Sequence, residues 1–304
     1  MQSPDLSPKT PESGPSETLC LPGGALVVAS ASRFWLHDAQ WLAQAGQHTL
    51  ADHGSADVMK QLLAACLLAG CRSHGAVSRP AGQRARTLPS YLWHLAGMYR
   101  TTHATPPAML LAAQRFDSRG DGVLAARCRE VAAEELGHDH LALADLRALG
   151  LDAPRFVDAV RPPTPMALAD LLGRMAGHEW PVAVFGYAFA LERFSLMVDG
   201  GQLAATEACL PAGVHASRCL RVHSAQGTDA RHVPESLEFM ATLEPADRAA
   251  IAIAAFETSR VLCQPTSWPG DDFVLRAARE CADGGANWLE PTLTDFSTHR
   301  KETA

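Results

Sequence analysis

Lysine is scarce in this chain of 304 residues: it occurs only as Lys9, Lys60 and Lys301, and arginine supplies the other basic side chains. The formal net charge is −7 at pH 7. A protein that binds nucleic acid needs a basic face, because lysine and arginine neutralise the phosphates. We therefore expect no nucleic-acid partner. The acidic charge is spread along the chain, which favours solubility rather than a particular partner.

Paired cysteine motifs and long apolar runs are also missing. None of the eight cysteines forms a CxxC pair, so we interpret them as reduced core residues rather than as a disulfide framework. The apolar stretch at 23–28 is too short to span a bilayer, and no basic segment followed by an apolar one opens the sequence. These absences predict a cytoplasmic protein without a membrane partner.

Aromatic residues are few as well, at 6% of the chain against 47% for hydrophobic residues of all kinds. This Ala/Leu-rich balance favours helices, and strand-like alternation never persists beyond a few residues. Residues 1–21 are rich in Pro, Ser and Thr, which predicts a disordered tail. We expect a single all-α domain over 22–285 and an irregular arm over 286–304.

Apolar residues recur three and four positions apart, which predicts a succession of helices. The expected helices cover residues 32–45, 56–71, 89–104, 106–116, 122–150, 164–177, 181–199, 203–210, 216–224, 232–243, 245–263 and 271–283. Several of them begin at a proline, whose missing amide donor is tolerated in the first turn. Gly150 fits a helix C-cap.

One polar pair stands out on the apolar stripe of the expected helix over 122–150. Glu135 and His138 are spaced i to i+3, about 60° apart around a helix, on the stripe that carries Leu124, Val131 and Ala142. A carboxylate on such a face needs a cation, a hydrogen-bond donor or a metal. Paired ligands at i and i+3 are how helical bundles hold iron or manganese.

A second carboxylate, Glu192, shares its helical face with Phe185, Phe189 and Leu196. An ion pair with Arg193 or Arg221 would explain it equally well, since ion-pair networks also bury carboxylates.

A third segment repeats the i, i+3 spacing with Asp229 and His232, and Phe239 follows on the same face. His223 ends the preceding helix, and Gly227 marks a break between the two. Metal binding would contribute to the folding of such a segment.

Tyr99 and His103 lie on another apolar helical face, and a lone histidine in that position is most often hydrogen-bonded within the core. We keep the pair only as outer-sphere or pocket residues. His140, by contrast, points away from the Glu135 stripe and is expected to face solvent.

Together these segments supply three carboxylates and three imidazoles: Glu135, His138, Glu192, His223, Asp229 and His232. Mixed oxygen and nitrogen ligation suits Fe or Mn better than metals that prefer thiolates or oxygen alone. Ferritin-like sites use two Glu-x-x-His motifs, whereas this chain has one, and an Asp-x-x-His with an extra His takes the place of the second.

The pattern resembles the heme-oxygenase-like diiron oxidases and oxygenases, in the fold superfamily of the TenA thiaminases and the PQQ-synthesis oxidase. The resemblance covers roughly residues 88–263. It rests on the motifs His103-Ala-Thr-Pro106, Ala132-Ala-Glu-Glu135-Leu-Gly-His138-Asp followed by Ala144-Asp-Leu-Arg-Ala-Leu-Gly150, Leu191-Glu192, and His223 through Asp229 to His232.

The resemblance implies a heme-oxygenase-like helical bundle with Glu135, His138 and Glu192 as catalytic metal ligands, joined by the His/Asp/His set. It also implies two Fe(II) ions per chain and O2 as co-substrate. The substrate of such an enzyme would be an amino acid, a fatty acid or another natural-product intermediate. Glu134 can exchange roles with Glu135, because i and i+4 are equally compatible with His138. His223 reaches the metal only if Gly227 permits a loop. Family analogy alone suggests a homodimer.

Two other readings remain open. A metal-free enzyme or small-molecule binder on the same fold, TenA-like or like the PQQ-synthesis oxidase, would use Glu135 and Glu192 as hydrogen-bonding groups. A non-catalytic scaffold would instead pair its buried acids with Arg127, Arg193 or Arg221. A heme oxygenase proper is disfavoured, because no N-terminal histidine is well placed as an axial ligand.

Overall fold

The computed structural model describes residues 16–37, 49–74, 87–227 and 229–289. Its elements are β1 (Glu17–Cys20), β2 (Leu26–Ala29), β3 (Phe34–His37), α2 (Ala56–Arg72), α3 (Leu88–Ser118), α4 (Gly122–Glu134), α5 (His138–Ala148), α6 (Ala153–Ala159), α7 (Pro163–Ala176), α8 (Ala183–Ser195), α9 (Gly200–Ala208), α10 (Arg218–Val222), α11 (Asp229–Ala241), α12 (Pro245–Leu262), α13 (Asp271–Glu280) and the 3-10 turn η3 (Asn287–Leu289).

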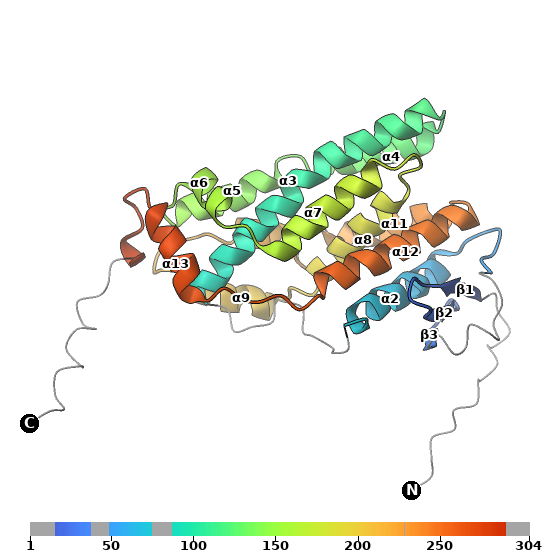
Figure 1. The fold of residues 1–304 in the computed structure, drawn as a ribbon, viewed down its shortest axis with the longest axis horizontal. Helices are drawn as coiled ribbons and strands as arrows, with labels where there is room; N and C mark the ends of the chain where they lie inside the picture. The colour runs from blue at the N-terminus through green and yellow to red at the C-terminus, as the bar shows by residue number, and fades with distance from the viewer. Residues whose placement is uncertain (1–15, 38–48, 75–86, 228, 290–304) are drawn as a thin grey trace, which may run out of the picture.

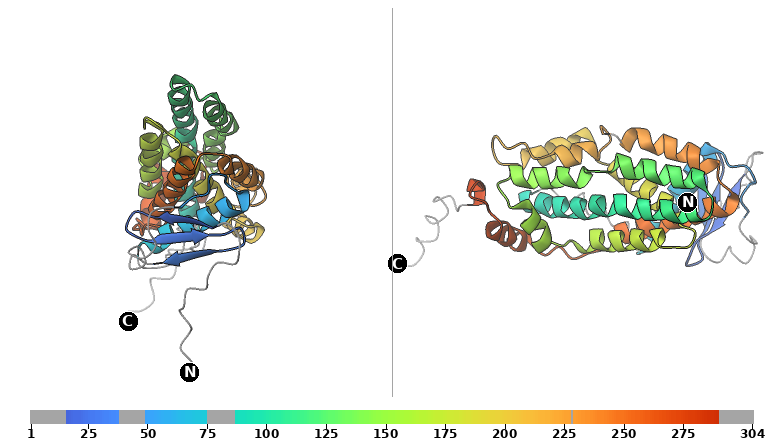
Figure 2. Two further views of the ribbon diagram at one scale, coloured as in Figure 1. Left: turned by 90° about the vertical axis from the view of Figure 1, so that its right-hand side faces the viewer. Right: turned by 90° about the horizontal axis from the view of Figure 1, so that it is seen from above.

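The long helix α3 runs through the bundle between α4 and α5 on one side and α7 on the other (Figures 1 and 2). α12 packs against α2 and α8, and α11 packs against α8 and α2. Among the helices that the structure describes, we find no segment with the length and hydropathy of a membrane span.

A three-stranded antiparallel sheet, in the order β1–β2–β3, covers α2 at one end of the molecule (Figure 2). Its register pairs Glu17 with Ala29 and Leu26 with His37. The sheet corrects two predictions: the disordered tail does not reach residue 21, and Phe34–His37 form a strand instead of the first turns of a helix. The strands are four residues long, too short for their alternation to show in the sequence. The remainder of that expected helix lies outside the described residues.

A buried ion pair fastens this sheet to the bundle. The guanidinium of Arg248 on α12 is fully buried and donates to Oε1 of Glu17 at 2.9 Å, to the carbonyl of Leu243 at 2.6 Å and to the carbonyl of Ala51. Hydrogen bonds of this kind offset the cost of burying the two charges, although Nε of Arg248 is buried without a hydrogen-bond partner among the described residues.

α3 is one continuous helix, so the predicted break before Pro106-Pro107 is wrong. A capping box starts it: the Ser90 amide donates to the Thr87 hydroxyl, and the Thr87 amide donates to the Ser90 hydroxyl. Each proline removes a backbone donor, but the neighbouring residues Ala108 and Met109 are buried against other helices. Packing along a 31-residue helix outweighs the two lost hydrogen bonds.

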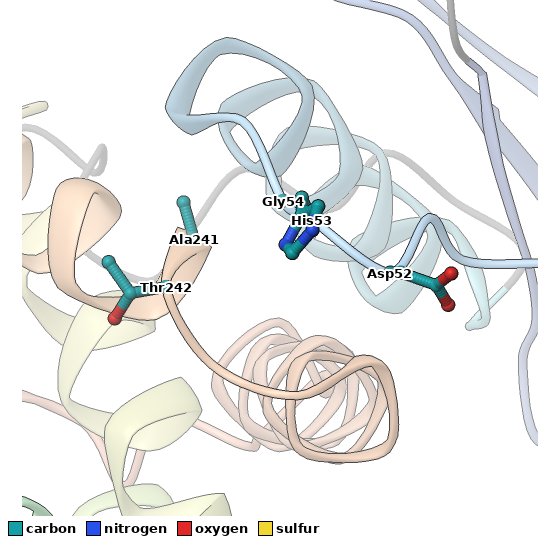
Figure 3. Close-up of a pocket in the computed structure, with 5 residues that line it drawn as sticks. All are labelled: Asp52, His53, Gly54, Ala241 and Thr242. Carbon is teal, nitrogen blue, oxygen red and sulfur yellow. The ribbon is translucent and has the colours of Figure 1, made fainter.

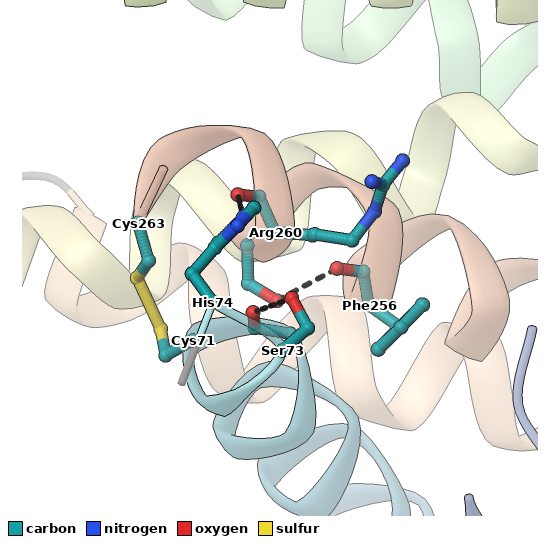
Figure 4. The surroundings of a disulfide bond; sticks show 8 residues. Cys71, Ser73, His74, Phe256, Arg260 and Cys263 are labelled. Carbon is teal, nitrogen blue, oxygen red and sulfur yellow. Dashed lines mark hydrogen bonds between the residues drawn. A yellow bond between two sulfur atoms is a disulfide. The ribbon is translucent and has the colours of Figure 1, made fainter. Parts of the chain in front are cut away.

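Cys71 at the end of α2 and Cys263 after α12 form a disulfide (Figure 4). The prediction that all cysteines are reduced is therefore wrong for this pair. The two residues are 192 positions apart in the sequence, and only the packing of α2 against α12 brings them together. Among the described residues, the other six cysteines form no disulfide, as predicted: Cys20, Cys66, Cys128, Cys209, Cys219 and Cys281.

The buried apolar residues form two clusters. The first contains residues of the sheet, α2, α4, α7, α8, α11, α12 and the second half of α3. The second contains residues of the first half of α3, α5, α6, α9, α10 and α13. The chain crosses from one cluster to the other several times, and these crossings position the candidate site.

Candidate metal centre

The predicted helix over 122–150 is interrupted, and the interruption carries the first candidate ligands. α4 ends at Glu134, and α5 begins at His138. Gly137 between them has φ 87°, a left-handed conformation that glycine adopts without steric cost. The prediction of one continuous helix is wrong here, because a helical pattern with an isolated glycine does not by itself show a break. Gly150 does end α5 as predicted, with the Leu151 amide bonded to the Leu146 carbonyl.

Glu135 and His138 meet across this break. Nδ1 of His138 lies 3.0 Å from Oε2 of Glu135, and the imidazole donates this hydrogen bond to the carboxylate. The side chains are 14% and 18% exposed, whereas the neighbouring Glu134 is exposed. Glu135, and not Glu134, is therefore the acid that faces His138.

His223 joins this pair from α10. It follows the last residue of α10, is buried, and its ring centroid lies 4.8 Å from that of His138 at an interplanar angle of 81°. One ligand atom from each of Glu135, His138 and His223 lies within 4.8 Å of the others. Gly227 closes the turn behind His223, where a Cβ would collide with the Val222 carbonyl.

Glu192 and His232 form a second group, between α8 and α11. Oε1 of Glu192 lies 4.0 Å from Nδ1 of His232, and the side chains are 14% and 5% exposed. Asp229 lies in the first turn of α11, but its side chain falls outside the described residues. The structure thus brings five of the six predicted ligands into two groups of carboxylate with imidazole.

Three arginines were the expected partners of the buried acids in a non-catalytic scaffold, and the structure gives the surroundings of each. Arg221 pairs with Glu207 on α9. Arg127 pairs with Glu130 at 3.2 Å, and its guanidinium stands over the Phe239 ring. Arg193 is exposed.

Tyr99 and His103 lie one turn apart on α3, and their role as outer-sphere or pocket residues stays a prediction. Their rings stack at 5.2 Å, but the His103 side chain is 62% exposed. Its Nδ1 lies 2.7 Å from the carboxylate of Asp139, in the first turn of α5. His140 is exposed, as predicted.

Both groups occur where the chain passes between the two apolar clusters. Glu135 and His138 separate α4 of the first cluster from α5 of the second. His223 follows α10 of the second cluster, and His232 lies in the first turn of α11, which belongs to the first cluster. Glu192 follows the last buried residues of α8, before the chain enters α9. We call these crossings between the two clusters the junction.

Two cavities on the described surface lie away from the candidate ligands. One, of about 300 Å³, is lined by Asp52, His53, Gly54, Ala241 and Thr242 beside α2 (Figure 3). Another, of about 520 Å³, lies against α9 and α10 and is lined in part by Glu207, Arg218 and Arg221. No candidate ligand lines either of them, so we do not assign the substrate to them.

Sequence reasoning missed one buried acid beside the site, Asp145. It is fully buried on α5 and accepts hydrogen bonds from the backbone amides of Arg218 and Cys219. Burial raises the pKa of its carboxyl above the usual range, and these hydrogen bonds oppose the rise. Its signal was available, because Asp145 stands seven residues after His138 and therefore on the same helical face.

No protein-family model matches this sequence, and no curated protein matches it. Two solved structures are similar to it. One is a domain of unknown function with a heme oxygenase-like fold from Shewanella denitrificans OS217, at 20% identity over 73% of this chain and 91% of that chain, with a TM-score of 0.53. The other is a TenA homolog from Pseudomonas syringae pv. tomato DC3000, at 16% identity over 75% and 94%, with a TM-score of 0.53.

These similarities show the fold. The chain has the heme-oxygenase-like, TenA-like helical bundle, and the prediction of an all-α fold of this class is confirmed.

The donor set at the junction fits iron. Glu135, His138 and His223 offer one carboxylate and two imidazoles, with one ligand atom of each within 4.8 Å of the others. This mixed set of oxygen and nitrogen donors suits Fe or Mn. The thiols are not part of it, since the cluster contains no cysteine.

Proposed function

We propose that this protein is a non-heme iron enzyme, with two ferrous ions per chain, that uses O2 to oxidise or oxygenate a small organic metabolite. The observation that carries the proposal is the Glu135–His138–His223 cluster, with Glu192 and His232 at the same junction of the bundle. Amino acids, fatty acids and other natural-product intermediates are the substrate class we propose.

The ligands of this site would come from three parts of the fold. Glu135, His138 and His223 would hold one ion, and Glu192 and His232 would contribute to the second, together with Asp229. Bound ferrous iron would supply the electrons that reduce O2.

The chain's own residues provide charge balance and a dry environment. Each carboxylate offsets part of the charge of a dication, and Glu135 orients the His138 ring through their hydrogen bond. His223 and His232 are 8% and 4% exposed, and the apolar side chains Phe185 and Phe189, which precede Glu192 on α8, are buried as well. A site withdrawn from water in this way strengthens electrostatic interactions and limits side reactions.

A metal-free enzyme or small-molecule binder on the same fold is the second candidate. The similarity to a TenA homolog is compatible with it. The Glu135–His138 hydrogen bond also supports it, since a carboxylate that fixes an imidazole can serve acid–base chemistry without a metal.

Anaerobic ferrous titration of the purified apoprotein, followed by mixing with O2, distinguishes the two. We expect uptake near two irons per chain and a transient visible absorption band. Glu192→Ala should lose the band, whereas Glu134→Ala, which alters an exposed acid next to Glu135, should keep it. The absence of specific uptake, with wild type and Glu192→Ala alike, would overturn the iron proposal and favour the metal-free one.

A further inference from the structure

Asp145 has no exposed surface, yet it carries a carboxylate in an apolar cluster. Its Oδ1 accepts from the Arg218 amide at 3.1 Å and from the guanidinium of the same residue at 3.4 Å. Its Oδ2 accepts from the Cys219 amide at 2.9 Å. These are the first two amides of α10, which have no acceptor within their own helix.

The residue that would ordinarily satisfy these amides does not do so. Ser217 precedes α10 at the N-cap position but makes no capping hydrogen bond. Its hydroxyl instead donates to Glu207 on α9 at 2.6 Å. Asp145 therefore caps α10 from a different helix, and this cap fixes the start of α10 against α5.

The other end of α10 carries the candidate ligand. His223 follows its last residue, and the His223 ring packs against His138 at the start of α5. His138 and Asp145 are seven residues apart, which places them on one face of α5 and about 10 Å apart along its axis. α10 thus lies antiparallel to α5 and is fastened to it at both ends: by Asp145 at its first turn and by the His138–His223 contact after its last.

Tyr91 on α3 also contacts this region, but it bonds to the segment that precedes α10 and not to α10 itself. The Tyr91 hydroxyl donates to the carbonyl of Ala216 at 2.6 Å. The Glu207–Arg221 pair lies on the exposed side of the same helix. Asp145 is the contact that reaches the helix amides from the buried side, and a helix of five residues has little stability of its own.

We propose that Asp145 is a positioning residue that holds His223 at the metal centre by capping α10 from α5. The inference rests on the proposed function, in which His223 is a metal ligand. Asp145 touches no reacting group, and it acts only through the placement of α10.

A double-mutant cycle in metal affinity tests this placement. Anaerobic Fe(II) affinity is measured for the wild type, Asp145→Ala, His223→Ala and the double variant. We expect Asp145→Ala to weaken affinity by about 10- to 100-fold, the range found for residues that orient metal ligands. In the His223→Ala background the same change should cost no further affinity, because the ligand it positions is gone.

Two further variants separate positioning from general destabilisation. Asp145→Asn keeps one acceptor oxygen and is expected to lose less affinity than Asp145→Ala. Asp247→Ala removes a different half-buried carboxylate, which accepts from Trp180 Nε1 at 2.7 Å at the start of α12. It should lower stability while changing Fe(II) affinity by less than about 3-fold, within the spread of independent sites.

A metal-free measurement keeps the inference apart from the proposed function. With 15N-labelled histidine, the ring signals of His138 and His223 in the apoprotein should shift in Asp145→Ala and stay in place in Asp247→Ala. If the wild type binds no iron, the proposed function fails, and these signals alone decide whether Asp145 places His223. A folded Asp145→Ala with wild-type affinity and unshifted His223 signals would overturn the inference, as would additive losses in the cycle.

Discussion

Glu17 and Glu135 are both acids withdrawn from water, but the structure neutralises them differently. Glu17 is 3% exposed and faces the fully buried guanidinium of Arg248 between the sheet and α12. Glu135 is 14% exposed and faces the imidazole of His138, with His223 beside it. No arginine or lysine of the described chain lies within ion-pair distance of Glu135.

The difference separates a structural pair from a candidate site. A guanidinium carries a permanent charge and five donors, so it completes the burial of Glu17 by itself. An imidazole carries a charge only when protonated and offers a metal-ligating nitrogen when it is not. We therefore expect changes on the α2–α12 side to alter stability and changes at the junction to alter binding.

The largest stability effect should come from breaking the Glu17–Arg248 pair. Arg248→Met leaves Glu17 buried without its cation and should lower the free energy of unfolding by about 3–5 kcal/mol, as for other buried pairs broken on one side. Chemical denaturation measures it. A loss below about 1 kcal/mol would show that Glu17 is not held by Arg248, and Glu17→Gln in the same chain should restore part of the loss.

Reduction of the disulfide should have the next largest effect on the same side. The Cys71–Cys263 bond closes a loop of 192 residues, and its loss should cost about 2–4 kcal/mol of unfolding free energy. Denaturation with and without a thiol reductant measures this. The double variant Cys71→Ala, Cys263→Ala should be insensitive to the reductant. Equal stability of the wild type in both conditions would contradict the prediction.

The junction should respond more weakly in the apoprotein. Glu135→Gln keeps the shape of the side chain and can still accept from His138, so we expect the free energy of unfolding to change by less than about 1 kcal/mol. The same denaturation experiment measures it beside Arg248→Met. A loss as large as that of Arg248→Met would show that Glu135 has a structural role like that of Glu17.

The smallest effect is expected at Tyr187 on α8. Its hydroxyl is buried without a hydrogen-bond partner among the described residues, and burial raises its pKa. Tyr187→Phe should therefore be neutral or stabilising by up to about 1 kcal/mol, because an unsatisfied polar group is removed. Tyr91→Phe is the matched control and should lower the free energy of unfolding, because it removes the hydroxyl that donates to the Ala216 carbonyl. Destabilisation by both variants alike would contradict the account.

Helical spacing predicted most of the helices, because it depends on local periodicity. It also paired Glu135 with His138, although the two meet across the break between α4 and α5 and not on one continuous helix. It also identified Glu192 and His232, whose apolar neighbours mark the buried face of a helix. Glu134 and Glu135 could not be distinguished from the sequence, because the choice between them depends on the turn at Gly137, which ends α4 before His138.

What the sequence did not predict depends on contacts between distant segments. The sheet consists of four-residue strands that pair only with one another and with α2. The disulfide needs α2 and α12 side by side. The role of Asp145 depends on the packing of α10 against α5. The sequence shows that Asp145 shares a helical face with His138, but it does not show that Asp145 accepts from the amides of α10.

Ferrous binding to two neighbouring variants tests the central claim most directly. Equilibrium dialysis without oxygen compares Glu134→Gln, which alters an exposed acid, with Glu135→Gln, which alters the acid that faces His138. We predict wild-type affinity for Glu134→Gln and a loss of more than about 100-fold for Glu135→Gln, beyond the range of residues that only orient ligands. Equal affinity in the two variants would contradict a metal centre at Glu135, His138 and His223.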